Sequence, residues 1–191
     1  MPGKKRVAGV FFFLLFSLLA SPLKARATNI SDLQVKLNGD DIYVSARLVM
    51  DPSLIKDLKA GIEKDLIFYV DVFRKWSSWP DEFIVGRRIE RQLKCDNVKG
   101  EYMIISDEGG RTRKGVRYAN CDDLIQDALA IKNVKVTSAK ELIWGKYVVK
   151  VSAESRLRNL PPLLGQMFFF LKDKEFKVDM KSPVMRLGSG K

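Results

Sequence analysis

The sequence predicts a mainly β protein with two short helices, folded as an antiparallel two-sheet sandwich. Apolar and polar residues alternate in many short segments, which is the pattern of half-buried strands. Connections of hairpin length dominate, and no strand–helix–strand rhythm runs along the chain. Only two short segments combine a helix cap with a helical apolar stripe. The same pattern permits an open or distorted β-barrel as the alternative.

A hairpin and a short helix are the first elements expected after the N-terminal segment. Residues 30–38 and 42–48 alternate, and Asn38-Gly39-Asp40 between them tolerates the positive φ of a hairpin turn. Asp51-Pro52 predicts a helix start, because aspartate accepts from free first-turn amides and proline fits the first helical position. We expect this helix to end at Gly61.

The longest β-rich run, Leu66–Glu82, is expected to form a central strand, a corner and the start of the next strand. Matching apolar to apolar residues across this hairpin selects one register. The predicted cross-strand pairs are Leu66 with Leu93, Val70 with Ile89, Trp76 with Phe83, and Asp71 with Arg88.

Trp76 and Trp79 flank the corner at Pro80. Two tryptophans at the corner of a sheet more often fill the end of a core than face solvent, so we expect both to be buried. The alternative is a pair of exposed anchors for a sugar or a protein, beside Arg74 and Lys75.

The second half of the chain continues the β pattern. Residues 102–106 predict a strand, and the basic arm at residues 111–117 predicts an edge strand protected by its charge. Asn120 is expected to cap the second helix. Further strands are predicted at residues 134–136, 147–157 and 176–180, and residues 186–191 should form a frayed tail.

The N-terminus has the three parts of a secretory signal peptide. Basic residues 4–6 precede an apolar run of 14 residues at 7–20, and Ala25-Arg26-Ala27 offers cleavage after Ala27. The run is shorter than the roughly 20 residues that cross a bilayer. We therefore expect a signal peptide at 1–27, one β-rich domain at 28–191, and export to the periplasm. The alternative is an uncleaved segment anchored in the inner membrane by residues 7–23.

The charge of the mature chain is moderate. Five of the 34 basic residues lie in residues 1–27 and none of the 23 acidic ones, so cleavage leaves a net charge of +6. Both signs are interspersed, and an exported protein seldom meets nucleic acid, so we expect no nucleic-acid partner.

The chain contains no histidine, which excludes Ser-His-Asp and Cys-His nucleophiles and HExxH zinc sites. Its two cysteines, Cys95 and Cys121, are too few for a structural zinc site. They form either one disulfide in an oxidising compartment or two buried thiols, and the sequence leaves both open. We expect no cofactor and no metal.

Four acids could supply paired carboxylates for glycoside chemistry: Asp71, Asp81, Glu82 and Asp96. Nothing in the sequence fixes a separation between any two, and turn or surface positions explain all four. We therefore predict no catalytic residue and no enzyme.

The apolar segment Leu160–Leu171 is the best candidate for an interaction surface. Three consecutive phenylalanines cannot all face inward from one ordinary strand, so some must meet a covering helix, a partner or a membrane surface. The alternative is a segment buried on both sides. The residues expected to line the surface are Leu163, Leu164, Met167, Phe168, Phe169 and Phe170.

An ordered set of short segments is informative when taken together. The segments are the Ile30–Val49 hairpin, Ala60-Gly61-Ile62, Val72–Lys75, Trp79–Glu82, Leu93–Tyr102, Gly145–Tyr147 and Leu160-Pro161. In this combination the chain resembles the bacterial domain-of-unknown-function family 4390, whose members are exported proteins of similar length. The resemblance implies export and a shared fold. It supplies no catalytic residue, because the family has no established activity.

The expected function is a non-catalytic binding module of the bacterial envelope, with an unknown envelope protein as partner. One alternative is a carrier that holds a lipid or other apolar ligand between the sheets or under residues 160–171. A third is an enzyme that acts through carboxylates alone. An uncleaved N-terminus would also bring the chain into contact with the membrane.

Overall fold

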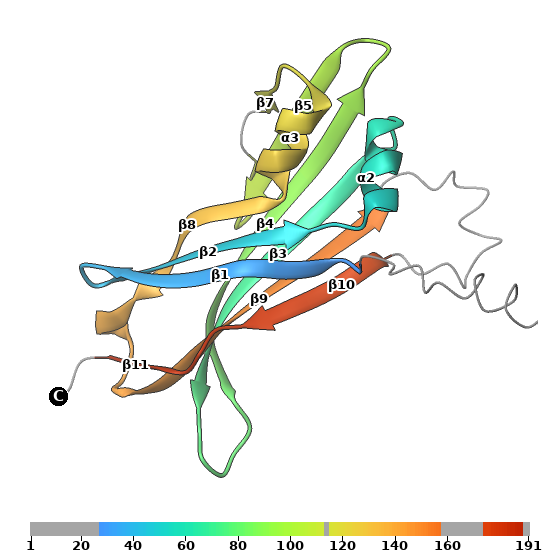
Figure 1. Cartoon of the computed structure of the whole chain (residues 1–191). Coiled ribbons are helices and arrows are strands. Elements are labelled where there is room, and N and C mark those ends of the chain that lie inside the picture. Colours follow the sequence, from blue (N-terminus) through green and yellow to red (C-terminus); the bar gives the residue numbers. More distant parts are fainter. Residues whose placement is uncertain (1–26, 113–114, 158–173, 189–191) are drawn as a thin grey trace, which may run out of the picture.

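The computed structural model describes residues 27–112, 115–157 and 174–188, which form two antiparallel sheets (Figure 1). The large sheet has the strand order β10-β9-β3-β4-β5-β6, with β11 paired to β9 and β7 paired to β5. The small sheet has the order β1-β2-β8. The predicted two-sheet sandwich is confirmed, and the described strands form no closed barrel.

The large sheet consists of β3 (Lys64–Lys75), β4 (Glu82–Asp96), β5 (Glu101–Glu108), β6 (Arg111–Thr112), β7 (Val116–Arg117), β9 (Gly145–Leu157), β10 (Lys174–Lys181) and β11 (Met185–Leu187). The small sheet consists of β1 (Asn29–Asn38), β2 (Asp41–Val49) and β8 (Ala130–Ser138). The helices within the described ranges are α2 (Pro52–Lys59), α3 (Cys121–Ala128) and the short 3-10 helix η1 (Ala139–Glu141).

Both α-helices begin where the sequence predicts. The Asp51 carboxylate accepts from the Ser53 amide at 2.8 Å, and the Asn120 side chain accepts from the Asp123 amide at 2.9 Å. Each such cap contributes about 1 kcal/mol. Just past the end of α2, Gly61 takes the left-handed conformation at φ 92°, which favours glycine because it has no Cβ.

The core lies between the two sheets and follows the predicted alternation. In β2 the buried side chains are Ile42, Val44, Ala46 and Leu48. In β3 they are Leu66, Phe68, Val70 and Val72, and in β9 they are Tyr147, Val149, Val151 and Ala153. Burying a side chain of the Val or Leu class stabilises by about 1.5–3 kcal/mol, so these rows hold the layers together.

A disulfide joins the C-terminal end of β4 to α3. Cys95 and Cys121 are bonded with their Cα atoms 5.6 Å apart, and both are buried. An ion pair between Lys59 and Asp122 at 2.5 Å links α2 to α3 beside it. The C-terminal half of β4 together with α2 and α3 is called the covered end below.

Arg91 is the main polar tie of the covered end. Its Nη1 donates to the backbone oxygens of Asp127, Ala128 and Ala130 at 2.9, 2.7 and 2.9 Å. These carbonyls lie at the end of α3 and the start of β8, where a helix leaves its last carbonyls without partners. Burial lowers the pKa of Arg91, and the nearby Asp127 carboxylate acts in the opposite direction.

The pairing of β3 with β4 has the predicted parity but a different register. Leu66 lies opposite Arg91 instead of Leu93, and Val70 is likewise displaced by two residues from its predicted partner. A shift of two residues leaves every side chain on its face of the sheet, so the core residues remain in the core. Leu93 instead faces Lys64 at the start of β3.

The predicted cross-strand pair of Asp71 with Arg88 is therefore wrong. Asp71 lies opposite Gly86, and a Cβ added to this glycine would stand 2.3 Å from the Asp71 carboxylate oxygen. Burial raises the pKa of Asp71, while the charge of Lys150 on β9 lowers it.

The pairing also departs from the prediction where β3 turns into β4. Phe83 lies opposite Phe73, three residues from its predicted partner Trp76, and the bulge between Val72 and Phe73 reduces this displacement to two residues along the rest of the pair. Six residues, 76–81, connect the two strands. Trp76 therefore lies in the connection and outside the pairing of β3 with β4.

Candidate functional site

The predicted interaction surface around Phe168–Phe170 falls within residues 158–173, outside the described residues. It therefore stays a prediction, as does the carrier role that depends on it. The signal-peptide prediction also concerns mainly residues outside this part of the chain, since the description begins at Ala27. No helix in the described ranges is long and apolar enough to cross a membrane.

All three tryptophans of the chain face solvent at one end of the large sheet. Trp76 is 44% exposed, Trp79 is 77% exposed, and Trp144 just before β9 is 57% exposed. The prediction that Trp76 and Trp79 fill the core is wrong, because the β3–β4 hairpin extends past the small sheet that would cover them (Figure 1). We call Trp76, Trp79, Phe83 and Trp144 the aromatic end.

Arg74 holds the aromatic end together. Its guanidinium lies 4.3 Å from the centre of the Trp76 ring, and its Nη2 donates to the Trp144 backbone oxygen at 3.5 Å. A cation over the face of an indole is attracted to it by the ring quadrupole. The Trp76 Nε1 donates to the Glu82 carboxylate at 3.1 Å on the neighbouring strand. The ring of Trp76 is thus fixed from two sides while much of its surface stays exposed.

Further apolar side chains surround these tryptophans. Phe83 is 56% exposed and meets Phe73 edge to face, with ring centres 5.8 Å apart. Ile143, next to Trp144, is 70% exposed. A monomeric protein rarely shows several large apolar side chains together at one end, and such groups mark interaction sites.

Three basic residues lie side by side next to the aromatic end. Lys146 of β9 pairs directly with Lys75 of β3 on one side and with Arg186 of β11 on the other. Directly opposed residues in antiparallel strands project from the same face, where like charges repel. Lys75 is neutralised by Asp81 at 2.9 Å, but Lys146 and Arg186 have no acidic partner among the described residues. These three residues are called the basic row.

Three of the four acids considered for catalysis are used in other ways, and the fourth, Asp71, lies opposite Gly86 in the β3–β4 pair. Asp81 pairs with Lys75, and Glu82 accepts from Trp76. Asp96 accepts from two backbone amides of the β4–β5 turn, at Val98 and Lys99. Its hydrogen bond from the Lys99 amide is the largest cause that lowers the pKa of Asp96. No group of three or more His, Cys, Asp or Glu that could hold a metal occurs in the described ranges.

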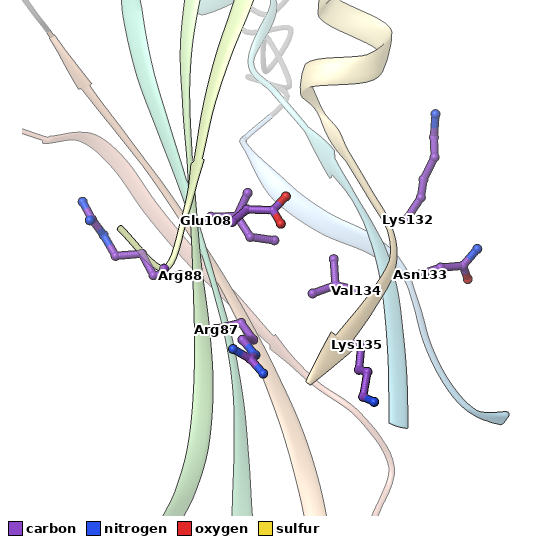
Figure 2. Close-up of a pocket in the computed structure, with 9 residues that line it drawn as sticks. Arg87, Arg88, Glu108, Lys132, Asn133, Val134 and Lys135 are labelled. Atoms are coloured by element: carbon purple, nitrogen blue, oxygen red, sulfur yellow. The ribbon is translucent and has the colours of Figure 1, made fainter. Parts of the chain in front are cut away.

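A charged cleft of about 420 Å³ lies where β8 passes β4 and the end of β5 (Figure 2). Figure 2 shows Glu108 and Val134 pointing into the gap, whereas Arg88 and Asn133 point away from it. Three of its cations already have acidic partners: Lys132 with Asp127, Lys135 with Asp41, and Arg88 with Glu90. The positive charges therefore do not converge on one point that an anion could occupy.

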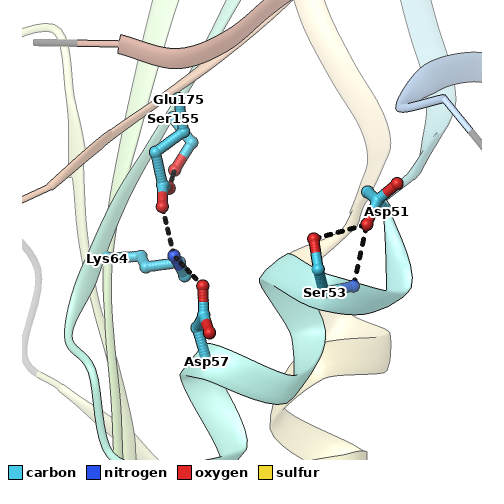
Figure 3. A network of polar contacts seen from close by, with 6 residues as sticks. All are labelled: Asp51, Ser53, Asp57, Lys64, Ser155 and Glu175. Atoms are coloured by element: carbon cyan, nitrogen blue, oxygen red, sulfur yellow. Dashed lines mark hydrogen bonds and ion pairs between the residues drawn. The ribbon is translucent and has the colours of Figure 1, made fainter. Parts of the chain in front are cut away.

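A polar network surrounds the buried side chain of Lys64 (Figure 3). Lys64 pairs with Glu175 of β10, and Asp57 of α2 lies 3.8 Å away. The Ser155 hydroxyl donates to the second Glu175 oxygen at 2.7 Å. Every member shown in the network has a partner, so the group ties β3, β9 and β10 together and leaves no open ligand position.

Comparison with known proteins places the chain in a family. Residues 25–182 match the family model described as "Domain of unknown function (DUF4390)". The chain belongs to this family. The resemblance inferred from the sequence is thereby confirmed, and the match spans every strand from β1 to β10. No curated protein and no solved structure matches the chain.

Membership in the DUF4390 family assigns no residue a role, so the site rests on the geometry alone. Sequence reasoning placed the tryptophans in the core and missed both Trp144 and the basic row. One signal was present: Ser77 and Ser78 between the tryptophans, followed by Pro80, are typical of an exposed connection. The basic row had no such signal, because its members are distant in sequence and meet only through strand pairing.

Proposed function

We propose that the chain is an exported, non-catalytic binding module of the bacterial cell envelope, and that the aromatic end is its docking surface. The observation that carries the proposal is the exposure of all three tryptophans on one projecting end. Tryptophan is enriched among the residues that dominate binding energy, and a ring that is held in place loses little freedom on binding.

The aromatic end is separate from the residues that stabilise the fold. The core between the sheets consists mainly of aliphatic residues with Phe68, Tyr147 and the two cysteines, and none of the three tryptophans belongs to it. Leaving an indole in water forfeits about 2–3 kcal/mol that burial would contribute. A docking role accounts for this arrangement, since the same rings become buried when a partner binds.

Export is supported by two independent features. The N-terminal segment has the order of a signal peptide, with basic, apolar and cleavage-site parts. The Cys95–Cys121 disulfide suits an oxidising compartment such as the periplasm, because cytosolic thiols are kept reduced.

The proposal is tested by sedimentation with a bacterial envelope fraction, using protein purified from expression of the full chain. Trp79→Ser removes the most exposed indole, and Val98→Ser is the matched control at an apolar side chain that is 98% exposed in the β4–β5 turn. We expect wild type and the Val98 variant to sediment with the envelopes, and the Trp79 variant to bind at least about tenfold more weakly.

Equal binding by all three proteins would move the docking surface away from the aromatic end. Absence of binding by the wild type would overturn the proposed function. Far-ultraviolet circular dichroism of each variant confirms that loss of binding does not come from unfolding.

A further inference from the structure

The shape of the aromatic end narrows the class of surface that it can meet. The β3–β4 hairpin projects beyond the small sheet, with Trp79 in the connection at its tip (Figure 1). The aromatic end is therefore a convex protrusion, whereas protein hot spots usually lie inside flat, well-packed patches ringed by neutral contacts. A protrusion can insert into a deformable surface such as the headgroup region of a lipid bilayer.

Several polar groups of the hairpin tip already have partners within the protein, which lowers the cost of burying them in a membrane surface. The Nε1 of Trp76 already donates to Glu82, and Lys75 already pairs with Asp81. Burying a donor or a charge costs less when it already has a partner. Trp79 and Trp144 can keep their N–H groups at headgroup level while their rings enter the apolar boundary, which is where tryptophan concentrates in membrane proteins.

The basic row supplies the complementary charge. Lys146 lies opposite Lys75 on one side and Arg186 on the other, and because Asp81 neutralises Lys75, the uncompensated repulsion is between Lys146 and Arg186. This repulsion is relieved when anions approach the row. At most about 14 Å of chain separates Lys75 from Trp79, given roughly 3.5 Å per residue. The row can therefore lie at the phosphates while Trp79 lies deeper, within the 5–10 Å that interfacial segments reach.

We propose that the aromatic end binds the surface of an anionic lipid bilayer. Trp79, Phe83 and Trp144 enter the headgroup and acyl boundary, and Lys146 and Arg186 contact the lipid phosphates. This inference rests on the proposed function and names the envelope component that the aromatic end meets.

The chain carries its own probe for this proposal. Because its three tryptophans all lie at the aromatic end, intrinsic tryptophan emission reports directly on the environment of this surface. Vesicles of phosphatidylglycerol and phosphatidylcholine are compared with vesicles of phosphatidylcholine alone. We expect a blue shift and co-sedimentation with the anionic vesicles, and both should weaken as salt is raised.

Two charge variants separate the basic row from net charge. Lys146→Gln/Arg186→Gln removes two cations of the row, and Lys36→Gln/Arg117→Gln removes two exposed cations from β1 and β7. A juxtamembrane cation contributes about fivefold in affinity for an anionic surface. The row variant should therefore bind anionic vesicles roughly 25-fold more weakly than wild type, and the control variant should bind as wild type does. Trp79→Ser should reduce the blue shift that anionic vesicles cause, because Trp144 is then the only inserting tryptophan.

Several results would overturn the bilayer proposal. Anionic vesicles that fail to bind the wild type while envelopes do bind it would leave the proposed function standing and make the partner a protein or a wall polymer. Envelopes that lose binding after protease treatment would identify a protein partner. Equal binding by the row and control variants would remove the role of the basic row.

Discussion

The two ends of the β3–β4 pair belong to the same two strands but differ in how they contact the rest of the protein. At the covered end, β4 is tied to α3 by the Cys95–Cys121 disulfide and by the three hydrogen bonds of Arg91. At the aromatic end, the hairpin leaves the sandwich and its tryptophans face solvent. Stability is therefore concentrated at one end, which leaves the other free to carry a docking surface.

The basic residues at the two ends also differ in whether they have partners within the protein. At the covered end, Arg91 donates to three backbone carbonyls and lies near the Asp127 carboxylate, and Lys59 pairs with Asp122. At the aromatic end, Lys146 and Arg186 have no acidic partner among the described residues. Cations that stabilise a fold are paired within it, whereas cations that meet a partner are left available. Substitutions at the two ends should therefore affect different properties.

The largest effect on stability is expected from loss of the disulfide. Cys95 and Cys121 are separated by 26 residues, and cross-linking a loop of this size contributes about 3.5 kcal/mol. Cys95→Ala/Cys121→Ala should lower the free energy of urea unfolding by about this amount. A reducing agent should destabilise the wild type and leave the double variant unchanged. If a reducing agent destabilised both proteins equally, the effect would not come from the disulfide, and the covered end would not owe its stability to this bond.

The next largest effect is expected at Arg91. Arg91→Met removes the donor to three carbonyls at the end of α3, and buried unsatisfied groups make this cost about 2–3 kcal/mol. Arg87→Met is the matched control, because Arg87 is exposed on the same face of β4. Its effect should stay within about 0.5 kcal/mol. An equal loss of unfolding free energy in both variants would mean that removal of a positive charge, and not loss of the carbonyl contacts, causes the destabilisation.

The smallest effect on stability is expected at the hairpin tip. Trp79→Ser removes a side chain that is 77% exposed, so the free energy of unfolding should change by less than about 0.5 kcal/mol. Urea unfolding followed by circular dichroism measures this change. A loss above about 1.5 kcal/mol would place Trp79 in a stabilising contact and remove the contrast between the two ends.

Local patterns predicted much of the fold. The alternation in β2, β3 and β9 identified the buried face of each strand, because successive side chains on a strand point to opposite sides. Asp51 and Asn120 identified both helix starts, since a cap is a contact between residues two or three apart. These features depend only on neighbours in the sequence.

Features that depend on distant neighbours were not predicted. The register of β3 against β4 is displaced by two residues from the one that apolar matching selects, and by three residues on the hairpin side of the bulge. The exposure of Trp76 and Trp79 follows from how far the hairpin extends past the small sheet, which no local pattern encodes. The basic row depends on the pairing of β3, β9 and β11. Sequence reasoning therefore found the scaffold, kept Trp76 and Trp79 as exposed anchors only as an alternative, and missed Trp144, Lys146 and Arg186.

The burial of Lys64 sets an order of events for a newly made chain. Its partner Glu175 lies 111 residues later, on β10, while Asp57 stands at the longer distance of 3.8 Å. Until β10 arrives, closing the sandwich would bury an ammonium group without its main counterion, which is strongly unfavourable. A chain delivered N-terminus first must therefore wait, with its apolar strands unprotected, until almost its whole length has emerged. We therefore expect formation of the last long strand, β10, to set the time at which the sandwich closes.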